Sequence, residues 1–341
     1  MPAGTTIQGR SRRARNLFLI FLPLVLAIFC WGLGRLQISV AAIFNFFITG
    51  IRDGQWDQRM FSVLISLRLP RIILALGCGS ALSVSGACFQ SVFSNPLASP
   101  DTLAVAAGAG FGAALALYMR QNMIVVQLSA MAFGFIAVSL TYFVSRIRGR
   151  VTTIMIVLSG MVVAALFQAG ISLIMTVAET EAMLPAITFW LMGSLASARY
   201  GTLVYGLPLI VAGMAIIFAL RWRLNVMALS DDEAQTLGVN VQRMRLVFSL
   251  AATMMVAAAV SMAGQIGWVG LVIPHICRMC FGSDHRDVIP ASISFGGSFL
   301  LLIDSFARSA YAAEIPLSIL TAALGAPLFI FLLHSSKGEG L

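Results

Sequence analysis

Apolar runs long enough to cross a lipid bilayer recur along this chain, and they constrain its fold more than any other feature. Hydrophobic residues make up 59% of the 341 positions, and charged residues only 10%. Because the bilayer core offers the backbone no hydrogen-bond partner, apolar runs of about 20 residues form helices there. We expect an all-α integral membrane protein with ten spans, at residues 17–36, 69–92, 97–119, 123–145, 151–177, 202–221, 246–266, 268–283, 288–309 and 315–334.

The net charge of +9 is explained by orientation in the membrane rather than by nucleic-acid binding. Short loops rich in Lys and Arg stay on the cytoplasmic side, so we expect both termini there. This divides the chain into a tail at 1–16, a transmembrane domain at 17–334 and a second tail at 335–341. The basic residues that ten spans place on one side are Arg10, Arg12, Arg13, Arg15, Arg146, Arg148, Arg150, Arg221, Arg223, Arg243, Arg245, Arg278, Arg286 and Lys337.

Two blocks of four spans, at 69–177 and 246–334, are expected to cross the membrane in opposite directions. Each begins with a helix ending in small residues, at 81–86 and 259–264, and continues into a segment broken by proline. Pro96 and Pro100 interrupt the first block, and Pro274 interrupts the second. This weak internal symmetry is typical of transporters built from inverted repeats.

A polar stretch at 222–245 separates two apolar runs and is expected to form a cytoplasmic loop with a short helix. Ser230 is placed to cap that helix, Asp231 and Asp232 complement its positive end, and Gly238 allows it to stop. A capped surface helix on a membrane bundle is suited to contact another protein. We therefore interpret 222–245 as a coupling loop for a separate energy-supplying protein.

Enzymatic chemistry finds little support in the sequence. No phosphate loop of the GxxxxGK[ST] kind occurs, and the three histidines, at 275, 285 and 334, are too dispersed to suggest a catalytic set. Cys277 and Cys280 form a CxxC pair that lacks the second half of a zinc site, so we assign no metal ligand.

Six ordered strings, from about residue 60 to the C-terminus, resemble the permease subunits of ABC importers of the iron-siderophore, haem and cobalamin class. They are RLPR at 68–71, SGACFQSVFSNPLASPDTLAVAAGAGFG at 85–112, FWLMGS at 189–194, DDEAQTLGV at 231–239, GQIGWVGLVIPHICRMCFGSDHR at 264–286 and IDSFARSAYAAEIPLSILTAALGAPLF at 303–329.

The resemblance implies ten helices per subunit in the type II importer fold and a homodimer with the transport path on its axis. It also implies two cytoplasmic ATPase subunits, which use ATP and Mg²⁺, and a periplasmic or lipid-anchored substrate-binding protein. This chain itself is then expected to hold no cofactor and to lie in the bacterial inner membrane.

The same resemblance assigns roles to individual residues. Arg68, Arg71 and Arg308 match arginines that receive acidic residues of the binding protein, which agrees with the bidentate pairing that arginine favours. Asp304 is expected to pair with Arg308 at i,i+4. The alternative role for these arginines is anchoring at lipid headgroups.

The coupling helix is expected to contact the ATPase through Leu237 and Gly238, with Glu233 and Ala234 on its approach face. The alternative is a solvated loop without a partner. The resemblance also places Asn95, Leu97, Thr152 and Thr153 at the cytoplasmic gate. For Asn95, an Asn-Pro turn with a purely structural role explains the sequence equally well.

An ABC importer permease for a ferric siderophore is the leading functional hypothesis; haem, cobalamin and molybdate are also compatible cargoes. An ion-coupled secondary transporter would need ionisable residues deep in the membrane, and most expected span centres carry none. An intramembrane enzyme would need a clustered set of reactive groups.

Overall fold

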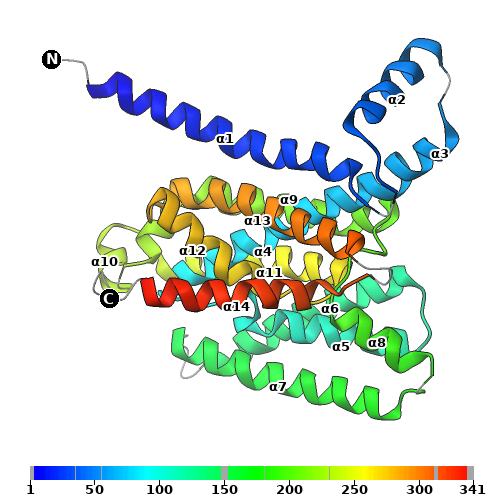
Figure 1. The fold of residues 1–341 in the computed structure, drawn as a ribbon. Helices are drawn as coiled ribbons and strands as arrows, with labels where there is room; N and C mark the ends of the chain where they lie inside the picture. Colours follow the sequence, from blue (N-terminus) through cyan, green and yellow to red (C-terminus); the bar gives the residue numbers. More distant parts are fainter. Residues whose placement is uncertain are drawn as a thin grey trace.

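The computed structural model describes residues 4–34, 36–54, 56–146, 153–179, 181–229, 231–310 and 314–335, and within these ranges the regular structure is helical throughout. The helices pack side by side in a bundle, with their axes roughly parallel in the view of Figure 1. Their bounds are α1 Gly4–Gly32, α2 Val40–Asp53, α3 Gln58–Phe61, the π-helical segment η1 Ser62–Arg68, α4 Leu69–Val92, the 3₁₀ turn η2 Pro100–Leu103, α5 Val105–Tyr118, α6 Met123–Ser145, α7 Thr153–Val177, α8 Met183–Leu191, α9 Tyr200–Met227, α10 Asp231–Thr236, α11 Val241–Ala263, α12 Val269–Phe281, α13 His285–Ser309 and α14 Leu317–Ser335.

Seven helical stretches of the described chain are long and apolar enough to cross a membrane, and α5, α12 and α14 supply three shorter apolar helices. Each of the ten overlaps one of the expected spans. Large apolar side chains cover much of the outer surface, such as Val204 at 67% and Phe331 at 68% exposure. A surface of this kind is stable in lipid and unfavourable in water. The all-helical membrane fold is therefore confirmed, while a total of ten spans stays a prediction.

The two ends of the bundle differ. α2, α3 and α8 lie at one end, and α10 lies at the other, where α1 begins and α14 ends (Figure 1). We call these the outer end and the inner end. The sequence patterns missed α2, α3 and α8, because these helices are too short for a membrane span. Both described termini lie at the inner end, as expected, although which side of a membrane this end faces stays a prediction.

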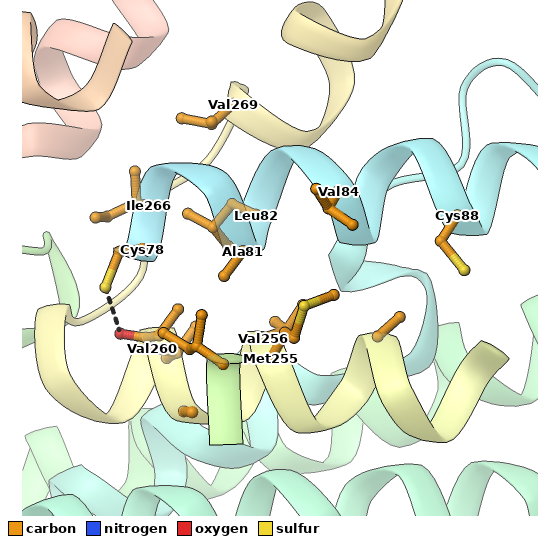
Figure 2. Close-up of a cluster of buried hydrophobic side chains, with 14 of the residues drawn as sticks. Cys78, Ala81, Leu82, Val84, Cys88, Met255, Val256, Val260, Ile266 and Val269 are labelled. Atoms are coloured by element: carbon orange, nitrogen blue, oxygen red, sulfur yellow. Dashed lines mark hydrogen bonds between the residues drawn. The ribbon is translucent and has the colours of Figure 1, made fainter. Parts of the chain in front are cut away.

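α4 lies at the centre, packed against α9, α11, α12 and α13. Small residues allow the close approach: a methyl group at Gly86 would overlap the carbonyl of Gly270, and one at Gly79 would overlap that of Gly296. Cys78, Ala81 and Cys88 of α4 point toward α11, which presents Met255 and its neighbours (Figure 2). Close backbone packing of this sort holds helices together where lipid removes the hydrophobic driving force.

Two long helices are each followed by a break and a short helix. After α4, the chain is irregular as far as Ala104, which has a φ of +61°, and α5 then begins. After α11, the break runs from Gly264 to Trp268, both with a φ of +71°, and α12 follows. The corresponding breaks favour the expected inverted repeat. In the second block, however, the break precedes Pro274, which lies inside α12.

Several expected boundaries differ from the structure. The third span begins at 105 rather than 97, because the Pro-rich segment 96–104 forms turns. The expected tail at 1–16 is helical from Gly4 onward, as part of α1. The expected loop at 222–245 is shorter, because α9 continues to Met227 and α11 already begins at Val241.

Candidate functional site

Arg68 and Arg308, two of the three expected docking residues, anchor the outer end of α1. Arg68 donates from Nη1 to the carbonyls of Trp31 at 2.7 Å and Gly32 at 3.1 Å, and from Nη2 to that of Leu36. Arg308 donates to the carbonyl of Cys30 at 2.7 Å. The last carbonyls of a helix have no partner within it, and cations are favoured there. Only 6% of Arg68 and 7% of Arg308 is exposed.

Arg71, the third, joins α4 to two carboxylates near the outer end. It donates from Nε to both oxygens of Asp304 at 3.0 Å, from Nη2 to Asp304 at 2.8 Å, and to Glu314 at 2.9 and 3.0 Å. The side chain of Asp304 is 1% exposed and that of Arg71 is 12% exposed. The expected pair between Asp304 and Arg308 is longer, at 3.9 Å, so Arg71 is the principal partner of Asp304.

In this conformation the three arginines are largely buried and do not form an exposed cationic surface. They lie at the expected end, but each donates hydrogen bonds to groups within the chain. The partners of Arg71 are 233 and 243 residues away in sequence, so no local pattern indicated them. A role in docking stays a prediction.

The coupling segment forms the short helix α10, which packs against α9 and α11. Gly238 ends it with a φ of +76°, a conformation that glycine adopts readily, and donates to the carbonyl of Gln235 at 2.9 Å. Leu237 is 62% exposed, and Glu233 is exposed as well. Ala234 was expected on the approach face but is 1% exposed and packs in the chain's own core, which corrects that assignment. The expected cap, Ser230, lies outside the described residues.

The expected gate begins at a turn after α4. The Asn95 side chain accepts a hydrogen bond from the backbone N–H of Leu97 at 2.9 Å, and Leu97 is 58% exposed. This hydrogen bond stabilises the turn from within, as expected if the Asn-Pro turn has a purely structural role. Thr152 lies outside the described residues, and Thr153 begins α7 with a side chain that is not described. Their proximity to Leu97 therefore stays a prediction.

A polar network at the inner end was missed by the sequence analysis. Asn225 of α9 donates to Asp284 at 2.8 Å and accepts from the backbone N–H of His285 at 2.9 Å. Asp284 caps α13 by accepting from the N–H of Arg286 at 2.9 Å, and these hydrogen bonds hold its pKa below the ordinary value. The Asp before an apolar helix was a signal that could have identified this cap.

A cavity of about 460 Å³ lies where the two broken segments meet, and we call it the junction cavity. The first turns of α5 and α12 line it, together with parts of α4, α7, α8, α11 and α14. Most of its wall is apolar. The polar side chains at its wall are Ser99, Asp101, Gln168, Thr188, Gln265 and Ser318. No sequence pattern indicated it, because its wall comes from elements distributed over most of the chain.

Metal binding by the chain itself finds no support in the described ranges, where no three His, Cys, Asp or Glu side chains gather as ligands. In the CxxC motif, Cys277 is buried and Cys280 is exposed.

Comparison with known proteins places the chain among import permeases. The sequence model of the FecCD transport family matches residues 20–335. The chain is 36% identical to the molybdate import system permease protein MolB of Haemophilus influenzae, covering 95% of this chain and 96% of that protein. It is 34% identical to the hemin transport system permease protein HmuU of Yersinia pestis, covering 94% and 96%.

A solved structure and a further sequence relative agree with this placement. An inward-facing metal-chelate type ABC transporter matches with a TM-score of 0.84 and 36% identity, covering 94% of this chain and 98% of that one. The cobalamin import permease BtuC of Halobacterium salinarum is 38% identical in sequence, over 81% of this chain and 74% of that protein. On the combined evidence of fold, sequence and structure, the chain belongs to the FecCD transport family.

Proposed function

We propose that this chain is the permease subunit of an ABC importer that takes up a metal chelate, with a ferric siderophore as the leading cargo. The observation that supports this most is similarity over 81–95% of the chain to permeases named for several metal-containing cargoes. An iron chelatin permease of Helicobacter pylori, 36% identical over 81% of this chain, favours iron among them.

The proposed assembly is a homodimer with two ATPase subunits and a substrate-binding protein. Exposed apolar side chains on α7, such as Val162 and Leu166 at 66% and 61%, offer a surface for a second copy. The family consists of permease subunits, so ATP and Mg²⁺ belong to the partner ATPase in this proposal. The membrane is then the bacterial inner membrane, with the inner end in the cytoplasm.

The ATPase is proposed to bind at α10. Leu237 is the apolar contact and Glu233 the polar one, because both side chains are exposed at the inner end. Ala234 supports this contact from the interior by fixing α10 to the bundle. Gly238 ends the helix so that Leu237 is presented at its tip.

The binding protein is proposed to dock at the outer end, near Arg68, Arg71 and Arg308. Because Glu314 already pairs with Arg71 and is 24% exposed, an acidic residue of the binding protein would have to displace it. The turn at Asn95 and Leu97 is proposed as one half of the cytoplasmic gate, with Thr152 and Thr153 as the other.

Uptake assays test the cargo. Cells that lack other iron uptake systems would express the chain with its cognate ATPase and binding protein. They would be offered ferric siderophores, haemin, cobalamin and molybdate, and a matched strain would carry an ATPase unable to hydrolyse ATP. We expect ATPase-dependent accumulation of a ferric siderophore. Uptake of cobalamin or molybdate alone would replace the leading cargo, and uptake in the ATPase-deficient strain would favour the secondary transporter.

A further inference from the structure

A small basic pocket lies between the inner ends of α6 and α11, two helices that pack against each other. We call it the arginine pocket, and its volume is about 240 Å³. The side chains that line it are Tyr142, Arg146, Gln242, Arg243, Arg245 and Leu246. In the described part of the chain, its wall therefore contains three arginines and no carboxylate. A hollow lined by charges of one sign attracts ions of the opposite sign, so this pocket is suited to an anion.

The ends of the two helices fix the positions of the arginines. Arg146 is the C-cap residue of α6, and the side chain of Asn240 caps α11 by accepting from the backbone N–H of Arg243 at 3.0 Å. Arg245 follows on α11 and is only 6% exposed, whereas Arg146 and Arg243 are exposed. A cation in the first turn of a helix lies at the positive end of the helix dipole, which is unfavourable. A bound anion would relieve this repulsion at Arg243.

Exposed apolar side chains continue from the arginine pocket along the same two helices. On α11, Leu246 of the pocket wall and Leu250, one helical turn further, are both exposed. On α6, Phe143 lies one turn before Arg146 and is 75% exposed, and Ile136 is exposed on the same face. Both helices are long and apolar enough to cross a membrane. A free anion would use the arginines alone, whereas a lipid would use the arginines and this apolar surface together.

We propose that the arginine pocket binds the headgroup of an anionic phospholipid from the leaflet at the inner end, with the acyl chains on the apolar surface of α6 and α11. Basic pockets between membrane helices recognise such headgroups, and arginine pairs with phosphate through two parallel hydrogen bonds. Pockets that enclose a whole small molecule measure about 300–1,000 Å³, so the smaller volume here fits a ligand of which only the headgroup enters. A zwitterionic lipid brings an ammonium group that the arginines repel. The inference does not depend on which cargo is imported.

Native mass spectrometry of the full-length permease in detergent measures the binding of individual lipids. The probes are cardiolipin, phosphatidylglycerol and the zwitterionic phosphatidylethanolamine, with inorganic phosphate as a competitor. The test variant combines Arg146→Gln with Arg243→Gln, because these two side chains are exposed and their replacement leaves the buried Arg245 in place. The matched control combines Arg221→Gln with Arg286→Gln, which removes two cations from the same end but outside the arginine pocket.

We expect the wild type to bind both anionic lipids at least about tenfold more tightly than phosphatidylethanolamine. An arginine near an anionic lipid contributes about fivefold in affinity, so the test variant should bind the anionic lipids about thirtyfold more weakly. The matched control should lose less than about threefold, because its cations lie outside the pocket. The variant Arg146→Lys with Arg243→Lys retains both charges and should retain the preference for anionic lipids.

Equal losses in the test variant and its matched control would show only a general attraction of lipid to the basic inner end, and would overturn the inference. Equal binding of phosphatidylethanolamine and the anionic lipids by the wild type would overturn it as well. Full displacement of the lipid by inorganic phosphate would assign the pocket to a free anion instead. Weaker co-purification of the test variant with the ATPase, at unchanged lipid binding, would assign the arginines to a protein partner.

Discussion

Removal of the Asp304 carboxylate tests whether a buried ion pair holds the outer end together. Arg71 makes three contacts to Asp304 at 2.8–3.0 Å, and the two side chains are 12% and 1% exposed. Breaking a buried pair by removing one partner costs about 3–5 kcal/mol. Because Glu314 still holds Arg71, we expect Asp304→Asn to lose about 3 kcal/mol of unfolding free energy, at the low end of that range.

Glu314→Gln should cost less, about 1 kcal/mol, because the lost hydrogen bonds are partly open to solvent. The triple variant Arg71→Met, Asp304→Leu and Glu314→Gln removes all three charges of the cluster and should be more stable than Asp304→Asn alone, since no member of the cluster keeps a charge without its partner. Reversible unfolding in denaturing detergent, followed by circular dichroism, measures all three, with Asp53→Asn as the exposed control. A loss of less than about 0.5 kcal/mol for Asp304→Asn, within the range of ordinary surface changes, would refute the reasoning.

Three further predictions concern other parts of the chain. Leu237→Ala should leave the free energy of unfolding unchanged but weaken ATPase binding at least about tenfold, because it removes an exposed apolar contact of the interface. Unchanged co-purification with the ATPase would contradict this. Asp284→Ala should cost about 1 kcal/mol at pH 7 as a lost cap. Since the pKa of Asp284 is held below its ordinary value, this contribution is present above about pH 4 and lost as the pH falls through the lowered pKa; a pH-independent difference would contradict it. Gly86→Val should lower the free energy of unfolding by about 3 kcal/mol, because the new side chain overlaps Gly270. The control Gly201→Val, whose side chain meets open space, should not lower it. Equal effects of the two substitutions would argue against close packing at α4.

The sequence predicted what depends on local patterns. Apolar runs identified the long helices, because length and composition alone decide which segments can span a bilayer. The end of α10 at Gly238 was likewise predictable, since a glycine after a polar helix is a common stop signal.

The remaining features depend on residues that are distant in the sequence. The partners of Arg71 come from α13 and from the segment before α14, so its burial in an ion-pair cluster could not be predicted from its own neighbours in the sequence. Ala234 was misplaced because a six-residue helix is too short for its inward face to be read from periodicity. The break before α12 lies at Gly264 and Trp268 rather than at Pro274, because a proline within a membrane helix is tolerated when neighbouring groups satisfy the freed carbonyl.

Transport by purified components in lipid vesicles tests the central claim most directly. One set of vesicles contains the permease, its ATPase and the binding protein, with ATP supplied on the side of the membrane where the ATPase lies. The other set contains the permease alone, under a proton or sodium gradient. The account predicts accumulation of a ferric siderophore only in the first set, and only while ATP is hydrolysed. Accumulation by the permease alone under an ion gradient would contradict it.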